Sequence, residues 1–192
     1  YTAQVSILML LAGCLKDTYE NTKESMDEIV RHIYYLTSEN ARKYTKDLSH
    51  LLRYTKHLFT IGRRRDYPTA MEAALKIKEV SYIHAEGFAG GQIKHGPIAM
   101  IENGTPCIVF VPNKNNSEIL SNAQELKSRG AFIIGISDKK HDVFDFWIKV
   151  IGPDKYSPIL RIIPIQALSY YLAVLKGLDP DKPRNLAKSV TV

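Results

Sequence analysis

Apolar positions at the beginning of the chain follow the spacing of helices rather than strands. Residues 1–15 form an almost continuous apolar run, which predicts a buried helix, and residues 21–36 place apolar side chains three and four positions apart. Ser38 is a suitable N-cap for a third helix that would reach about residue 54. We therefore expect residues 1–55 to form a helical segment that packs on the rest of the domain.

Beyond this segment the period changes, and short apolar runs alternate with helical patterns. The runs are typical of buried strands and occupy residues 57–62, 106–112, 131–137 and 144–150. The helical patterns cover residues 69–83, 117–128 and 165–177, with Gly177 as the expected cap of the last helix. This alternation predicts a three-layer α/β/α core with a parallel sheet, at residues 56–178. Residues 179–192 lack such a period and are expected to form an irregular tail.

The composition is that of an ordinary folded domain of 192 residues, with 45% apolar and 24% charged residues. The net charge of +6 is spread thinly except at Arg63, Arg64 and Arg65, and no zinc-finger spacing or basic helix interleaved with aromatic residues accompanies it. Nucleic acid is therefore not an expected partner. Residues 1–15 lack a basic leader and are too short to span a bilayer, so we expect no membrane association and a cytoplasmic location.

The cysteines and histidines do not suggest a metal centre. Cys14 and Cys107 each lie inside an apolar run, far apart in the sequence, and we expect two buried, inert thiols rather than a disulfide. No Cys-x-x-Cys or His-rich spacing is present. We expect neither a metal nor another cofactor.

Titratable side chains and glycines gather in "KEVSYIHAEGFAGGQIKHGP", residues 78–97. The stretch overlaps the predicted helix at residues 69–83. In this helix Lys76 and Glu79 are three positions apart and share a face, as the residues of a surface ion pair would. Glycines permit close approach of a ligand, and the neighbours of His95 restrict its backbone, so this histidine is as compatible with a site as with a structural role. His84 continues the apolar stripe of the helix, and we interpret it as structural.

Two separated motifs carry a resemblance to a known family. "ALKIKEVSYIHAEGFAGGQIKHGPIAMI" and "DKPRNLAKSVTV" resemble the second sugar-isomerase (SIS) domain of the glucosamine-6-phosphate synthase family, also called glutamine–fructose-6-phosphate aminotransferases (isomerising). The resemblance runs from the first helix to the last residue. It implies a sheet of about five parallel strands flanked by helices, and an enzyme that converts fructose 6-phosphate and glutamine into glucosamine 6-phosphate and glutamate.

The resemblance also assigns roles to individual residues. The family's catalytic glutamate falls on Glu79, which would move a proton between C1 and C2 of the sugar, and Lys76 would assist that transfer. The family's histidine falls on His95, which would act in the active site of a neighbouring subunit and promote ring opening. Lys188 would form a Schiff base with the sugar carbonyl. Ala187, Lys188 and Glu79 would contact the substrate.

The sequence departs from the family pattern in three places. Gln92 replaces a glutamate, and Arg64 interrupts a Gly-Arg-Gly turn, leaving a triplet of arginines that is either a solvated turn or an anion-attracting rim. Parallel sheets bind ligands at the C-terminal ends of their strands. There the family's SIS domains hold phosphate with a Ser/Thr-rich loop, but this chain has "NKNNSE" after residue 112. Asn115, Asn116 and Ser117 can cap a helix but do not rebuild that phosphate-binding loop.

These departures leave two functions to compare. The first is the C-terminal isomerase half of the synthase, with the glutaminase domain and the first SIS domain outside this chain. Its expected ligand is a sugar phosphate, and we expect a homodimer formed through the helices that flank the sheet. The second is a non-catalytic SIS module that binds sugar phosphates in a regulatory role or mediates assembly. The joint presence of Lys76, Glu79, His95 and Lys188 favours the enzyme, because a sensor needs no proton transfer. We expect the isolated chain to be inactive.

Overall fold

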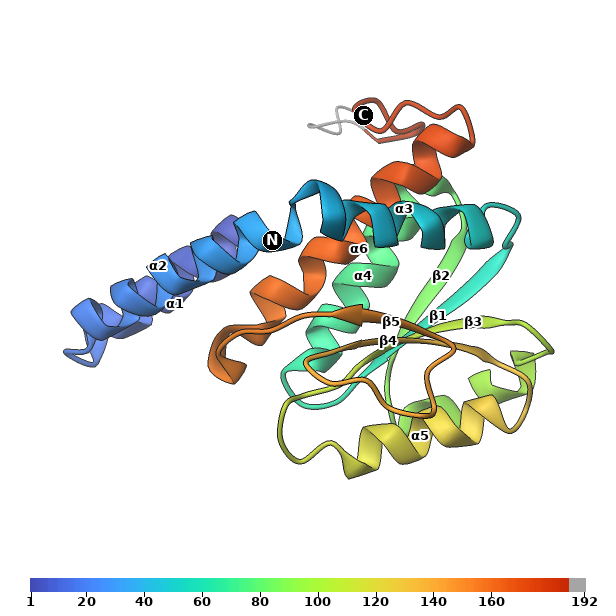
Figure 1. The fold of residues 1–192 in the computed structure, drawn as a ribbon, viewed down its shortest axis with the longest axis horizontal. Helices are drawn as coiled ribbons and strands as arrows, with labels where there is room; N and C mark the ends of the chain where they lie inside the picture. Colours follow the sequence, from blue (N-terminus) through green and yellow to red (C-terminus); the bar gives the residue numbers. More distant parts are fainter. Residues whose placement is uncertain (187–192) are drawn as a thin grey trace.

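The structure is a computed structural model, and it describes residues 1–186. A helical hairpin and a third helix precede an open sheet whose strands alternate with helices (Figure 1). The helices are α1 (Thr2–Leu15), α2 (Tyr19–Leu36), α3 (Glu39–Leu52), α4 (Asp66–Ser81), α5 (Ser117–Lys127) and α6 (Ser157–Leu175). The strands are β1 (His57–Gly62), β2 (His84–Ala89), β3 (Pro106–Phe110), β4 (Phe132–Ser137) and β5 (Phe146–Lys149). Short 3₁₀ turns are η1 (Gln92–Lys94), η2 (Pro97–Met100) and η3 (Asp154–Tyr156).

The five strands form one parallel sheet in the order β2-β1-β3-β4-β5. Helices α3, α4 and α6 lie on one face of the sheet, and α5 covers the other (Figure 1). The predicted three-layer α/β/α architecture is therefore confirmed. Sheets of this kind expose the carboxyl ends of their strands along one edge, where connecting loops form binding sites.

Alternate residues of the central strand β3 supply two separate cores. Ile108 and Phe110 pack toward α4 and α6, whereas Cys107 and Val109 pack toward α5, and all four are fully buried. A strand buried on both faces must be apolar at every position, which is why the runs over β1, β3 and β4 are continuous in the sequence. Burial raises the pKa of the Cys107 thiol, so the expectation of a buried, inert thiol holds for this cysteine.

Two glycines allow α4 to approach the sheet closely. A Cβ atom on Gly62 would lie 2.1 Å from the backbone oxygen of Asp66, so only glycine fits the turn from β1 into α4. A Cβ atom on Gly87 would lie 2.8 Å from the Cα atom of Met71. The Thr60 hydroxyl also donates a hydrogen bond of 2.6 Å to the carbonyl of Ala70. The beginning of α4 is thereby fixed over β1 and β2.

A buried ion pair joins the beginnings of α4 and α6. The Arg161 guanidinium donates to both carboxylate oxygens of Asp66 at 2.7 Å, and both side chains are almost fully buried. Burial raises the pKa of the Asp66 carboxyl, and the charge of Arg161 opposes this shift. Removal of one partner from a buried pair typically costs about 3–5 kcal/mol, because it leaves the other charge uncompensated.

Helix α6 begins earlier than the predicted start at residue 165. It starts at Ser157 and continues through Pro164, which lies inside the helix. Gly177 follows the helix with φ of 69° and terminates it as expected. Asp154–Leu175 is long and apolar enough to cross a membrane by length and composition, but 67% of its most apolar part is buried inside the fold. The apolarity of this segment is accounted for by its place in the core.

The quoted stretch contains the edge strand β2, which the apolar pattern did not predict. Helix α4 ends at Ser81, and Tyr82 adopts a left-handed conformation with φ of 57°. His84 therefore lies on the edge strand rather than on the helix, and its side chain is 63% exposed. The expectation that His84 continues the apolar stripe of α4 is wrong. Its Nδ1 atom lies 3.4 Å from that of His57 on β1.

The hairpin of α1 and α2 extends away from the sheet (Figure 1). The prediction that residues 1–15 form a helix is correct, but the expected burial is wrong, because Gly13 is the buried residue of α1. The exposed apolar side chains of this helix are Ile7, Leu8, Leu11 and Leu15. Cys14 is also exposed, which corrects its expected burial.

Candidate functional site

The last two turns of α4 carry a partly buried group of charged side chains. The Lys76 ammonium contacts the Glu79 carboxylate, and Glu72 lies on its other side at 3.9 Å. Glu79 is 28% exposed and Lys76 is 31% exposed, so neither is fully solvated as in a simple surface ion pair. The spacing of three and four residues places all three side chains on one helix face. Glu72 is only 14% exposed, and its part in the group was missed in the sequence.

Lys76 reaches a small cavity between α4 and α6. The cavity has a volume of about 110 Å³ and is lined by Lys76, Val80, Gln166, Ser169, Tyr170 and Pro180. Pro180 belongs to the C-terminal tail, so three segments meet at this point. The site therefore combines a charged helix face with a small concave surface.

The described part of the tail returns to the end of α4. The backbone N–H of Arg184 donates a hydrogen bond of 2.7 Å to the Tyr82 hydroxyl, and the Arg184 guanidinium lies 4.2 Å from the centre of the same ring. Just before the tail, the Lys176 ammonium donates to the carbonyl of Ser81 at 3.0 Å, and partial burial lowers the pKa of Lys176. These contacts hold the tail beside the helix end that carries Glu79. Ala187 and Lys188 themselves lie outside the described residues.

His95 is not brought together with Lys76 and Glu79 within one chain. It follows η1, beyond the carboxyl end of β2, whereas Glu79 lies just before the amino end of that strand. The six residues of β2 separate the two positions by about 20 Å. His95 is exposed, and its neighbour Lys94 is bound to Glu125 of α5 at 2.6 Å. His95 and Glu79 therefore do not share a site within one chain.

Two glycines of the quoted stretch serve internal packing. A Cβ atom on Gly90 would lie 2.6 Å from the Oδ1 atom of Asn122 and 2.8 Å from the Ile119 side chain. Gly87 lies against α4 in the same way, so these two positions admit neighbouring helices. Within residues 1–186, no three His, Cys, Asp or Glu side chains gather as metal ligands would.

Comparison with known proteins places the chain in a family. The SIS domain model matches residues 51–175. The glutamine–fructose-6-phosphate aminotransferases (isomerising) of Pyrococcus horikoshii and Geobacillus kaustophilus are 43% and 41% identical to the chain over its full length. In each case the chain covers 33% of the relative, so it spans about one third of these proteins.

Solved structures agree with this assignment. The C-terminal domain of glucosamine-fructose-6-phosphate aminotransferase from Francisella tularensis matches with a TM-score of 0.75 and 32% identity, over 86% of this chain and 47% of that one. A tagatose-6-phosphate ketose/aldose isomerase from Escherichia coli shares the fold, with a TM-score of 0.63 and 21% identity, over 73% of this chain and 42% of that one. The chain belongs to the SIS domain family.

Proposed function

We propose that the chain is the isomerising C-terminal part of a glutamine–fructose-6-phosphate aminotransferase. It would convert fructose 6-phosphate and ammonia into glucosamine 6-phosphate, with the ammonia released from glutamine by an upstream domain. The observation that carries this proposal is the partly buried Lys76–Glu79 pair beside the docked tail. A proton shuttle needs a carboxylate that is held in place and partly shielded from water, and α4 supplies one.

The chemistry assigned to these residues conserves atoms and charge. The Lys188 amine would add to the C2 carbonyl of the open sugar and release water to give an imine, from which ammonia displaces the lysine. Glu79 would then remove a proton from C1 while the imine nitrogen gains one, which gives an enolamine. Return of the proton from Glu79 to C2 and loss of the C1 hydroxyl proton would generate the C1 aldehyde and the C2 amine. Lys76, bound to Glu79, would orient the carboxylate and the sugar hydroxyls. No metal or organic cofactor takes part in these steps.

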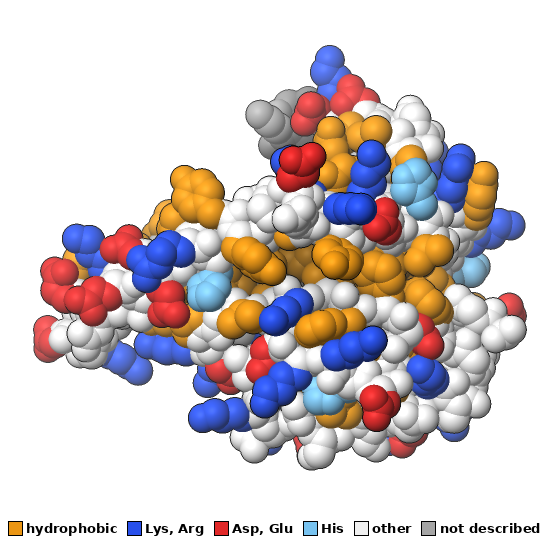
Figure 2. Space-filling view, viewed as in Figure 1, with side chains coloured by type: hydrophobic (Ala, Val, Ile, Leu, Met, Phe, Trp, Pro, Cys, Tyr) orange, Lys and Arg blue, Asp and Glu red, His pale blue; other side chains and the backbone are white. Residues whose placement is uncertain are grey.

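The proposal includes a homodimer, because His95 and Glu79 lie at opposite ends of β2. The apolar surface available for such contacts is large. Figure 2 shows hydrophobic side chains gathered across the middle of one face. Tyr35, Tyr44 and Trp147 line a groove beside α3 and β5. Leu8 and Leu11 of α1 add exposed apolar area. We also place the protein in the cytoplasm, since Cys14 and Cys107 are both free thiols.

A turnover assay tests the proposed function. In a protein that contains the upstream domains, Glu79→Gln should reduce formation of glucosamine 6-phosphate by about 10²–10⁴-fold, while glutamine hydrolysis continues. Glu86→Gln makes the same chemical change on the exposed edge strand and should leave synthesis intact. Near-normal synthesis by Glu79→Gln would contradict the proposal. Lys76 and Glu79 would then be interpreted as a structural ion pair, and the non-catalytic module would be favoured. The isolated chain should show negligible turnover, because it lacks the Ser/Thr-rich loop with which SIS domains hold the phosphate of the sugar.

A further inference from the structure

Two histidines meet where the first two strands of the chain begin. His57 is the first residue of β1 and His84 is the first residue of β2, and the parallel register places them directly opposite each other. They are 27 positions apart in the sequence, so no short metal-binding motif contains both. The pairing of β1 with β2 therefore brings together two imidazoles that the sequence did not link.

Both histidines project from the face of the sheet that α5 covers. Leu58 and Ala85 belong to the core that α4 and α6 cover, and side chains alternate between the two faces along a strand. His57 and His84 therefore lie on the opposite face, at the amino edge of the sheet, and both are exposed. Glu79 belongs to α4 on the other side of the sheet, so the histidine pair is separate from the proposed isomerase site.

The two rings turn the same nitrogen atom toward each other. The Nδ1 atom of His57 lies 3.4 Å from the Nδ1 atom of His84, and the ring planes are 87° apart. Hydrogen bonds from N–H groups to oxygen are most often about 2.9–3.0 Å long, so this contact is loose for a single shared proton. Two imidazoles on one zinc ion, with bonds of about 2.0–2.1 Å at the tetrahedral angle, hold their nitrogens about 3.3–3.4 Å apart. The spacing therefore matches a pair of metal ligands.

A carboxylate faces the far nitrogen of His84. Glu86 follows two positions later on β2, on the same face, and one of its oxygens lies 3.5 Å from the Nε2 atom of His84. A carboxylate there favours a proton on Nε2 and leaves the lone pair on Nδ1, which is the nitrogen that faces His57. Histidines that bind metals are commonly oriented by a carboxylate at their other nitrogen. Glu86 would thus orient a ligand without being one.

The exposure of the pair lets the rings adjust to an ion. The side chain of His84 is 63% exposed, and exposed side chains rotate on fast timescales. Small ring rotations can direct both lone pairs at one ion, while the paired strands keep the two Cα atoms opposite each other. Two side chains supply the protein ligands, and water would complete the coordination, as in metal sites that keep open positions.

We propose that His57 and His84 bind a divalent transition-metal ion of the zinc class through their Nδ1 atoms. Imidazole suits zinc, copper and nickel, whereas magnesium and calcium prefer oxygen ligands. The ion would tie the beginning of β2 to the beginning of β1, two residues after Tyr82, which holds the tail through Arg184. A ligand that binds only the folded chain stabilises it, so the metal should raise the temperature of unfolding.

Calorimetric titration with zinc chloride tests the proposal on the 192-residue chain, prepared without an affinity tag and in a buffer that does not chelate metals. One zinc ion should bind per chain, and magnesium chloride at the same concentration should give no binding. Zinc should also raise the midpoint of thermal unfolding. Absence of saturable zinc binding up to about 1 mM, the range of the weakest specific affinities, would overturn the proposal.

Substitutions locate the ion. His57→Asn and His84→Asn each remove one imidazole from an exposed position, so both variants should fold like the parent chain. Each should weaken zinc binding at least about tenfold, because loss of even an outer partner of a metal ligand typically costs about 10–100-fold. Zinc should then no longer raise the midpoint of unfolding at the concentration that stabilises the parent chain.

His32→Asn is the matched control. His32 also faces a carboxylate, that of Glu28 at 3.6 Å, but it lies on α2, away from the histidine pair. This variant should bind zinc like the parent chain and should be stabilised by it to the same extent. Unchanged zinc affinity in both His57→Asn and His84→Asn would place any bound ion elsewhere and contradict the assignment, whatever the outcome for isomerisation.

Discussion

The backbone N–H of Arg184 donates a hydrogen bond of 2.7 Å to the hydroxyl of Tyr82, the residue that terminates α4. This contact fixes a point of the tail beside the helix that carries Glu79. Lys188 follows Arg184 by four residues, and four residues of extended chain span at most about 14 Å. This contact therefore limits the distance that can separate Lys188 from the end of α4.

Loosening this contact should weaken the chemistry assigned to Lys188. Tyr82→Phe removes the hydroxyl that accepts from Arg184, and Tyr82→Ala also removes the ring beneath its guanidinium. A hydrogen bond of this kind contributes about 0.5–1.5 kcal/mol, so trapping of fructose 6-phosphate by borohydride should slow by a few fold in Tyr82→Phe and by more in Tyr82→Ala. Mass spectrometry measures the trapped adduct in the protein that contains the upstream domains.

Lys188→Arg is the reference for this experiment. Arginine keeps the positive charge but cannot form the imine, so no adduct should be trapped in this variant. Trapping at the parental rate in Tyr82→Ala would show that docking of the tail on Tyr82 does not position Lys188.

A site shared between two subunits predicts complementation. Glu79→Gln and His95→Ala should each be inactive as pure proteins, whereas a mixture that exchanges subunits should regain activity. Random pairing gives mixed dimers with one intact site each, so about a quarter of the parental activity should return. Continued inactivity of a mixture whose subunit exchange has been verified by mass spectrometry would contradict a site shared between two subunits.

The two cysteines should differ strongly in reactivity. Cys14 is exposed on α1, and Cys107 is buried in β3, where burial raises the pKa of its thiol. Because the thiolate is the reactive form, one thiol per chain should react quickly with a disulfide reagent under native conditions. The second should react only on unfolding, and Cys14→Ser should abolish the fast phase. Two fast thiols in the native protein would contradict the position of β3 in the core.

The elements that were predicted correctly are those whose burial leaves a clear apolar pattern. Strands β1 and β4 are covered on both faces, so their continuous apolar runs mark their ends closely. The sequence did not predict strand β2, because β2 is an edge strand with polar residues and lacks a continuous apolar run. Gly87 adds no apolar side chain, since the backbone of α4 lies too close for one. The predicted range of helix α6 was too short, because the helix extends on the N-terminal side of residue 165 and includes Pro164. The apolar sequence of α1 predicted that this helix would be buried, but most of its large apolar side chains are exposed.

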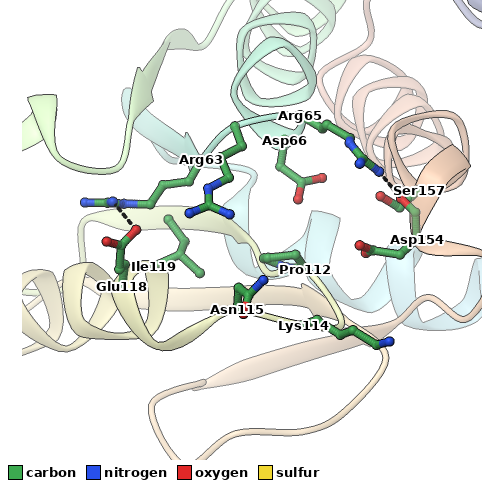
Figure 3. Close-up of a pocket in the computed structure, with 11 residues that line it drawn as sticks. Arg63, Arg65, Asp66, Pro112, Lys114, Asn115, Glu118, Ile119, Asp154 and Ser157 are labelled. Atoms are coloured by element: carbon green, nitrogen blue, oxygen red, sulfur yellow. Dashed lines mark hydrogen bonds and ion pairs between the residues drawn. The ribbon is translucent and has the colours of Figure 1, made fainter.

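The candidate site was predictable in its local part alone. Lys76 and Glu79 share a helix face by their spacing, so their contact follows from sequence. Glu72 obeys the same spacing and could have been found in this way. The cavity that Lys114 and the arginine triplet line (Figure 3) could not be predicted from the sequence, because these residues come together only when β1 and β3 pair in the sheet. The choice between a solvated turn and an anion-attracting rim therefore depended on the tertiary structure.

Exchange of solvent deuterium into C1 of fructose 6-phosphate tests the central claim most directly, because it records the proton transfer itself. The measurement uses nuclear magnetic resonance in D₂O, with the protein that contains the upstream domains and with glutamine left out. The parental enzyme and Glu86→Gln should both incorporate deuterium at C1, and Glu79→Gln should do so about 10²–10⁴-fold more slowly. Incorporation by Glu79→Gln at the parental rate would contradict the assignment of Glu79 as the base.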